Sequence, residues 1–276
     1  MVTVLRPLST SELLDRTFHL YKNNFLVFLG IAAIPQLFVL ALRLWYAMTL
    51  TGPINSFNRF NGTGVLISIA SYVAIEISAA ATVIAVSNIH LDRSIGVGSA
   101  FGGAKSSMVR VLLITLAVSI AAGIGLIFLI VPGVYLWLMW SLAIPATVLE
   151  GGGLNVSTTR SKYLTQGSRG RVFVICLLII LLVWIVSVIC ELPLGMLIGI
   201  VFRSHLSSHA MPLIVTASAV GTFLSTSLVG PLLTIALTLI YYDQRVRKEG
   251  FDLQLMMASL QPGSQPPAAA AAATTN

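Results

Sequence analysis

One long apolar stretch of the chain, residues 111–149, contains no charged residue and ends at Glu150. Pro132 and Gly133 interrupt it near its middle. A continuous helix over the 40 residues 111–150 would be about 60 Å long, which is twice the thickness of the hydrocarbon core of a bilayer. The stretch is therefore either two membrane spans joined by a tight turn at 131–133, or one span with a long apolar overhang.

Apolar stretches alternate with polar connections along the whole chain, and together they predict six transmembrane helices. The expected spans are residues 25–42, 65–89, 111–131, 134–149, 172–200 and 212–242. Polar, part-helical segments precede pairs of these spans, at 9–22, 98–110 and 157–171. We therefore predict an all-α fold: a polytopic membrane helical bundle of six transmembrane helices in three hairpins, each preceded by a cytoplasmic interfacial helix. Residues 1–260 would form a single integral membrane domain, and the Pro- and Ala-rich residues 261–276 a disordered tail.

Residues 9–22 show the pattern of an amphipathic helix. Ser9 and Glu12 have the spacing of a capping box, in which each side chain accepts a hydrogen bond from the other residue's backbone N–H. Leu13, Phe18 and Tyr21 fall close to one face, and most charged residues fall away from it. An amphipathic helix directly before a span is typical of a segment that lies in the membrane interface.

The composition indicates a membrane protein. Hydrophobic residues make up 57% of the chain and charged residues only 9%, whereas soluble domains contain about 25% charged residues. The net charge of +7 would also suit a nucleic-acid-binding protein, but the sequence shows no motif of that class. Cations beside apolar spans set the orientation of the chain and meet anionic lipid headgroups. We therefore expect membrane lipids as partners, and no nucleic acid.

The distribution of cations decides between the two interpretations of 111–149. With six spans and both termini inside, all of the 16 Lys and Arg residues except Arg43, Arg59 and Arg203 are cytoplasmic. A single crossing would leave seven inside and nine outside. Because cytoplasmic segments are enriched in Lys and Arg, the six-span arrangement is preferred. We expect a multi-pass protein of the bacterial inner membrane with cytoplasmic N- and C-termini and Pro132 at the outer face.

Three charged residues lie within or beside the spans, where a charge is unfavourable by at least about 2.5–3.5 kcal/mol. Arg43 and Glu191 lie at similar depth near the outer interface, and we predict that they form a structural ion pair. Glu76 lies near the middle of its span. On the cytoplasmic side we predict contacts between basic residues and lipid headgroups. These residues are Arg160, Lys162, Arg169, Arg171, Arg245, Arg247 and Lys248.

A polar site is predicted at mid-depth, where Pro231 interrupts the last span. Ser227 and Thr234 lie about one turn before and after this proline, and Glu76 and Tyr72 share a face of the second span. Together they would form a buried site for an ion, a proton or a small ligand, as in transporters with broken helices. The alternative is that Ser and Thr hydroxyls bond to the freed backbone, while a protonated Glu76 is hydrogen-bonded inside the bundle.

The sequence shows no catalytic constellation, no cofactor fingerprint and no complete set of metal ligands. His205 and His209 have the i, i+4 spacing of two metal ligands, but no third ligand lies nearby except Glu191. We therefore predict no enzyme activity, no cofactor and no metal site.

Residues 231–252 read Pro-Leu-Leu-Thr-Ile-Ala-Leu-Thr-Leu-Ile-Tyr-Tyr-Asp-Gln-Arg-Val-Arg-Lys-Glu-Gly-Phe-Asp. This segment resembles a bacterial family, the membrane domain of glycerophosphoryl diester phosphodiesterases and its stand-alone relatives. Shorter stretches at 5–9, 14–16, 131–150 and 160–167 are similar to it as well, so that the likeness covers about residues 5–252. The resemblance implies a helical membrane domain and no chemistry. The family's enzymes carry hydrolysis on a separate barrel of about 250 residues, whereas only 252–276 follow here.

Two functions fit these observations. The first is a non-catalytic inner-membrane protein that organises lipids or partner proteins, as a subunit of a larger membrane complex or as a homo-oligomer. The alternative is a transporter or channel component that uses the polar site around Glu76 and the Pro231 kink.

Overall fold

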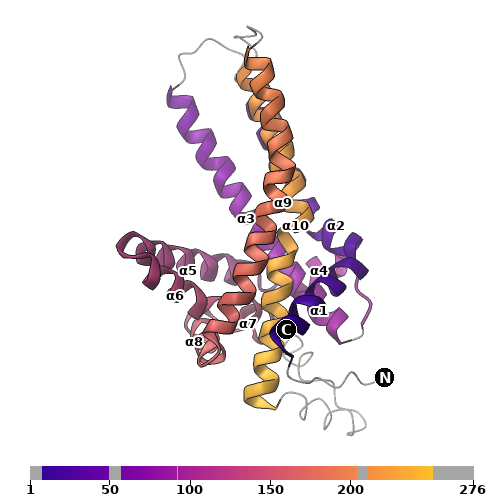
Figure 1. The fold of residues 1–276 in the computed structure, drawn as a ribbon, viewed down its shortest axis with the longest axis vertical. Coiled ribbons are helices and arrows are strands. Elements are labelled where there is room, and N and C mark those ends of the chain that lie inside the picture. Colours follow the sequence, from indigo (N-terminus) through magenta and orange to yellow (C-terminus); the bar gives the residue numbers. More distant parts are fainter. Residues whose placement is uncertain (1–7, 50–56, 92, 204–209, 251–276) are drawn as a thin grey trace.

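The computed structural model describes residues 8–49, 57–91, 93–203 and 210–250, and within these residues every regular element is an α-helix (Figure 1). The predicted tail at 261–276 and the pair His205 and His209 lie outside the described residues. The all-α prediction is confirmed for the part of the chain that the structure describes.

Four long helices form the body of the molecule. They are α2 (Phe25–Thr49), α3 (Phe57–His90), α9 (Arg169–Arg203) and α10 (Ala210–Glu249). The central helix is α10, which packs on α9, α2 and α3. Every residue from 235 to 242 is buried, so this part of α10 is covered by protein on all sides.

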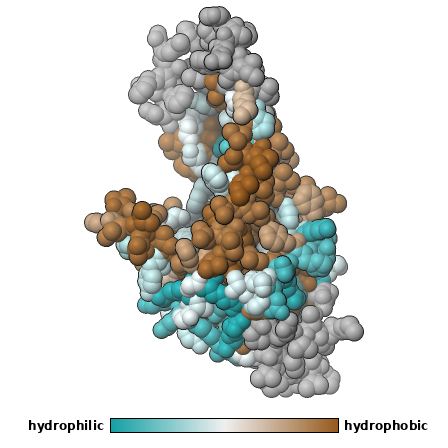
Figure 2. Space-filling view, viewed as in Figure 1, coloured by the Kyte–Doolittle hydropathy of each residue, from teal (hydrophilic) through white to brown (hydrophobic). Residues whose placement is uncertain are grey.

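Four short helices gather at one end of the body: α1 (Thr10–Asn23), α4 (Val97–Ala104), α7 (Ala143–Glu150) and α8 (Leu154–Thr165). They pack against α3 and α10, and hydrophilic residues collect there below a broad apolar band (Figure 2). We call this end of the molecule, together with the last turns of α10, the polar end.

The predicted capping box of α1 is confirmed. The Ser9 hydroxyl accepts from the Glu12 N–H at 3.2 Å, and the Glu12 carboxylate accepts from the Ser9 N–H at 2.7 Å. On the predicted apolar face, Leu13 is fully buried but Phe18 is exposed. The Tyr21 hydroxyl donates to the Leu228 carbonyl of α10, and burial raises the pKa of Tyr21 to about 12. This phenol therefore stays a neutral donor that fixes α1 to α10.

Six helical segments are long and apolar enough to cross a membrane, as predicted. They are Phe25–Met48, Gly62–His90, Met108–Phe128, Ile130–Glu150, Arg169–Pro193 and Ile214–Glu249. The predicted interruption of the last span is wrong, because Pro231 lies inside the continuous helix α10; Pro193 likewise lies inside the continuous helix α9. The second candidate span begins at Gly62, three residues before the predicted start at 65, and its helix α3 begins at Phe57.

Helices α5 (Met108–Phe128) and α6 (Ile130–Trp140) form an antiparallel pair that projects sideways from the body (Figure 1). We call this pair the arm. Its turn lies at Leu129, which is extended at φ −164° and ψ 144°, and not at 131–133 as predicted. Pro132 is instead in the first turn of α6, where the N–H groups have no partner within the helix and a missing one is tolerated.

The predicted single span at 134–149 is two helices, because the chain breaks at Ser141 and Leu142 between α6 and α7. Pro145 favours a break here, since it has no N–H for the Ser141 carbonyl and crowds it. Two side chains of α8 bond to the interrupted backbone. The Ser161 hydroxyl donates to the Met139 carbonyl at 2.9 Å and accepts from the Leu142 N–H at 3.1 Å. The Thr165 hydroxyl lies 3.3 Å from the same carbonyl.

The two helices of the arm meet closely at Gly125 and Gly133. A Cβ built on Gly125 would lie 2.9 Å from the Cα of Gly133. A Cβ on Gly133 would lie 2.6 Å from the backbone nitrogen of Leu126. The backbone cannot give way cheaply at such distances, so both positions require glycine for the observed packing.

Gly133→Ala should therefore destabilise the arm by about 1–3 kcal/mol, the usual effect of forcing a methyl group into a packed site. Thermal unfolding followed by the fluorescence of Trp137 and Trp140, both on α6, measures this after Trp45→Phe and Trp184→Phe have removed the two tryptophans outside the arm. The matched control is Gly123→Ala on α5, where an added Cβ meets nothing within 4 Å and helix propensity predicts an unchanged or higher midpoint. Equal effects of the two substitutions would contradict the close crossing.

Candidate functional site

A cavity of about 140 Å³ lies among α2, α3 and α10, beside Pro231. A single water needs about 10–15 Å³ on this measure, so several waters or a small solute fit. Its polar lining comes from all three helices. These side chains are Gln36, Ser78, Thr82, Thr226 and Thr234.

Three of these polar groups have no partner among the described residues. The Gln36 amide is only 7% exposed and makes no hydrogen bond there, and the hydroxyls of Thr82 and Thr234 donate none. In contrast, Ser78 and Thr226 donate to carbonyls of their own helices, at 2.8 Å and 2.6 Å. An unpartnered buried polar group is unfavourable by about 1–3 kcal/mol. The cavity therefore has spare hydrogen-bonding capacity that a small polar molecule can satisfy.

Pro231 contributes to the spare hydrogen-bonding capacity of the cavity. It offers no N–H to the Ser227 carbonyl one turn earlier, and no side-chain hydroxyl of the described residues donates to that carbonyl instead. The Ser227 hydroxyl is itself buried without a partner. Among the described residues, no hydroxyl bonds to the backbone freed by Pro231, as the alternative to a ligand site would require.

The structure separates the two halves of the predicted site. Ile75, Ser78 and Thr82 of α3 face the cavity, whereas Tyr72 and Glu76 point toward α5. The Tyr72 hydroxyl lies 2.6 Å from that of Thr115. One buried oxygen of Glu76 has no hydrogen bond within the described residues. Thr234 lines the cavity, but Ser227, Tyr72 and Glu76 are not among its lining residues.

The predicted ion pair between Arg43 and Glu191 is not formed in the structure. Arg43 instead lies 3.5 Å from the hydroxyl of Ser71, and Glu191 accepts from Ser225 at 3.5 Å. Both distances are at the limit for a hydrogen bond. Similar depth along two spans was the basis of the prediction, and depth alone does not fix the direction in which a side chain points.

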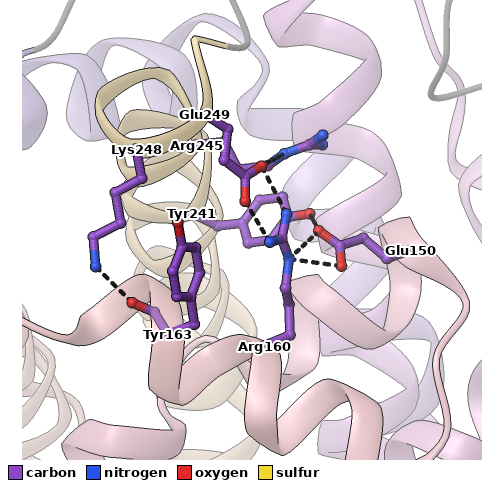
Figure 3. Close-up of polar contacts among 7 residues, drawn as sticks. All are labelled: Glu150, Arg160, Tyr163, Tyr241, Arg245, Lys248 and Glu249. Atoms are coloured by element: carbon purple, nitrogen blue, oxygen red, sulfur yellow. Dashed lines mark hydrogen bonds and ion pairs between the residues drawn. The ribbon is translucent and has the colours of Figure 1, made fainter.

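An ionic cluster joins α7, α8 and α10 at the polar end (Figure 3). The Arg160 guanidinium donates to Glu150 at 2.8 Å and to Glu249 at 2.7 Å. The Tyr241 hydroxyl donates to the same Glu150 at 2.5 Å, and Arg245 donates to Glu249 at 3.3 Å. Partial burial lowers the pKa of Arg160, but the two carboxylates outweigh it and raise the pKa overall. The guanidinium stays charged and connects three helices.

A second ionic cluster surrounds Asp243, whose side chain is 1% exposed. Arg171 of α9 donates to this carboxylate at 2.8 Å and Arg247 of α10 at 2.9 Å. The N–H of Leu8 donates to it as well, at 2.8 Å. This carboxylate therefore joins the chain just before α1 to the ends of α9 and α10.

Most of the predicted headgroup cations thus bind other parts of the protein. Arg160, Arg171, Arg245 and Arg247 pair with carboxylates, as described above. Lys248 donates to the Tyr163 carbonyl at 2.5 Å and to the Gln166 carbonyl at 2.7 Å. Arg169 donates to the Tyr135 hydroxyl. Lys162 is exposed and has no side-chain partner among the described residues. Headgroup contact by these residues stays a prediction, best supported at Lys162.

A second hollow, a groove of about 530 Å³, lies between α1 and the end of α3. Leu20 and Ile89 contribute its apolar part, and its other lining residues are polar or charged. These are Asp15, Arg16, His19, Asn23, Asn24 and His90. This groove was not predicted from the sequence, because its cationic and imidazole groups come from helices about 70 residues apart and meet only in the fold.

No protein-family model matches the chain, and no match was found among curated proteins or solved structures. The resemblance to the phosphodiesterase membrane domain therefore stays a prediction. Within the described residues, no group of three or more His, Cys, Asp or Glu side chains is arranged to hold a metal ion.

Removing the Arg160 side chain tests the ionic cluster. Arg160→Gln leaves Glu150 and Glu249, which are 26% and 15% exposed, without their shared cation. Because the site is partly hydrated, we expect a loss of about 1–3 kcal/mol in the free energy of unfolding. Thermal or detergent-induced unfolding measures it.

The matched control for this substitution is Lys162→Gln, two residues away on α8, which should change stability little. The double variant Arg160→Gln, Glu249→Gln should recover part of the loss by removing one of the two like charges. No recovery in the double variant would contradict the electrostatic origin of the effect.

Proposed function

We propose that this chain is a non-catalytic integral membrane protein of the bacterial inner membrane that binds and organises anionic lipids at its cytoplasmic face. Both termini and the polar end lie on the cytoplasmic side in this proposal, because most Lys and Arg residues belong to the segments that connect spans there. In chain order, the proposed three units are α1 with α2 and α3, α4 with α5 to α7, and α8 with α9 and α10.

The main support for this proposal is the groove between α1 and α3. It places Arg16 and two imidazoles, His19 and His90, beside apolar Leu20 and Ile89. A lipid has the same division into a polar headgroup and apolar chains. A cation near an anionic membrane surface contributes about 1 kcal/mol of attraction. Asp15, the one carboxylate in the lining, disfavours an anion, so the proposal depends on Arg16.

Arg16→Gln should therefore lower the preference for anionic lipid about fivefold, the equivalent of about 1 kcal/mol. The measurement is native mass spectrometry of the purified protein titrated with phosphatidylglycerol and with phosphatidylcholine. Lys22→Gln is the matched control, because Lys22 is an exposed cation of α1 that does not line the groove. If the unsubstituted protein binds both lipids equally, or if both variants lose the same affinity, lipid binding in the groove is rejected. A stoichiometric protein that co-purifies in place of lipid would indicate a complex subunit.

The cavity at Pro231 favours a second candidate, a channel or transporter component for a small polar solute. It is supported by Gln36, which is 7% exposed, makes no hydrogen bond among the described residues and lines the cavity together with Thr82 and Thr234. Glu76, which was expected to take part, faces α5 and is assigned no role in this candidate.

The substitution Gln36→Leu tests whether the cavity is a solute site or only a defect in packing. In the purified protein, it should raise the unfolding midpoint, because it removes an unpartnered amide worth about 1–3 kcal/mol. In proteoliposomes, with glycerol as the probe, it should reduce light-scattering-detected flux at least tenfold, whereas Glu76→Gln should leave the flux unchanged. Flux no greater than that of protein-free liposomes would remove this candidate.

A further inference from the structure

The arm does not run parallel to the long helices of the body. In Figure 1, α5 and α6 point sideways, whereas α9 and α10 stand along the long axis of the molecule. Both pairs are apolar enough to enter a membrane, yet both cannot lie along the membrane normal. If α9 and α10 cross the bilayer, the arm must lie at a large angle to that direction.

Polar contacts place the arm near the polar end. The Tyr135 hydroxyl, halfway along α6, accepts from Arg169, and the Arg169 guanidinium lies 4.6 Å from the centre of the Tyr135 ring. Arg169 is the first residue of α9. If Pro132 lay at the opposite membrane face, Tyr135 would lie within about 5 Å of that face, some 25 Å from the start of α9. The observed contact is incompatible with that depth.

The tip of the arm, residues 127–131, is apolar and exposed. The five consecutive residues from Ile127 to Val131 are 84%, 77%, 67%, 74% and 76% exposed, and none has a polar side chain. Water would be an unfavourable environment for such a surface, by about 25 cal/mol for each Å². The tip must therefore lie against an apolar medium.

The residues around the tip favour lipid acyl chains as the apolar medium that covers it. The arm carries no charged residue between Val111 and Trp140, so no part of it beyond Arg110 requires water. Figure 2 shows its apolar surface directly above the hydrophilic residues of the polar end, at the level of the apolar band on the body. On α9 this band includes Leu177, Leu181 and Trp184, each 49% to 62% exposed. A single layer of lipid chains would cover both surfaces.

We propose that the arm is a re-entrant hairpin: it enters the bilayer from the side of the polar end, lies among the acyl chains of that leaflet, and returns to the same side. The bilayer is then crossed four times, by α2, α3, α9 and α10. The arm adds volume to one leaflet only, and displaces lipid from that leaflet alone.

Cysteine accessibility tests this topology in the full chain after Cys176→Ala and Cys190→Ala. Three exposed positions are compared: Ile130→Cys at the tip, Gly62→Cys near the far end of α3, and Lys162→Cys on α8. With a membrane-impermeant maleimide, Gly62→Cys should label in intact cells and Lys162→Cys only in inverted vesicles. Ile130→Cys should label in neither. Labelling of Ile130→Cys together with Gly62→Cys would overturn the proposal in favour of two full crossings.

A nitroxide at the same cysteine identifies the covering medium. In liposomes, the label at position 130 should collide with oxygen and not with a water-soluble nickel chelate, as expected in hydrocarbon. Poor access to both reagents, or a disulfide between two copies at Ile130→Cys, would show a protein covering the tip and overturn the lipid assignment. Neither result depends on Arg16, so loss of lipid binding in the groove and failure of the re-entrant topology are separate outcomes.

Discussion

A backbone that is interrupted where water is excluded needs hydrogen-bond partners from the protein, because an unpartnered buried N–H or carbonyl is unfavourable. The chain between α6 and α7 meets this need through two hydroxyls of α8. Ser161 bonds on both sides of the break, to Met139 and Leu142, and Thr165 lies against the same Met139 carbonyl. Both hydroxyl-bearing residues are fully buried. The direction of the arm follows from this contact, since the end of α6 is held against α8 at the polar end.

The charge distribution is equally compatible with two crossings and with an arm that enters and returns. In either case Arg110 before the arm and Arg160 after α7 lie on the same side of the membrane. The positive-inside rule reports the side of each connecting segment and carries no information about how deep the intervening helices go. The count of cations disfavours a single crossing of 111–149, but it does not distinguish the other two topologies.

The features that could be predicted from sequence are those that depend on neighbours along the chain. The capping box at Ser9 and Glu12 is local, and it was predicted correctly. The apolar segments were also found, because their composition alone distinguishes them. The break at Ser141 depends on residues 20 positions later in the chain, and Ser161 and Thr165 look like ordinary polar residues of a connection. The turn of the arm was misplaced by assigning Pro132 to a loop, when the first turn of a helix accepts it equally well.

The residues of the candidate site could be predicted from the sequence only in part. Glu76 and Pro231 were grouped because each lies near mid-depth in its span, yet they face different neighbours. The position of a residue along its span gives its depth in the membrane. The direction in which its side chain points depends on how the helices pack. On α3, Ile75 points into the cavity and Glu76, the next residue, points toward α5, as the 100° step between successive helical residues requires. Depth alone therefore could not identify Gln36 and Thr82 as residues that line the cavity beside Pro231.

The central helix α10 is restrained unevenly along its length. Its last turns are held by two ionic clusters, through Asp243 and Glu249, which connect it to α8, α9 and the chain before α1. Near Pro231 it lacks one backbone hydrogen bond and borders a cavity with unpartnered polar groups. A helix fixed at one end and weakened in the middle bends most easily at the weak point. The helix α10 is therefore most firmly fixed at the polar end and least restrained beside Pro231.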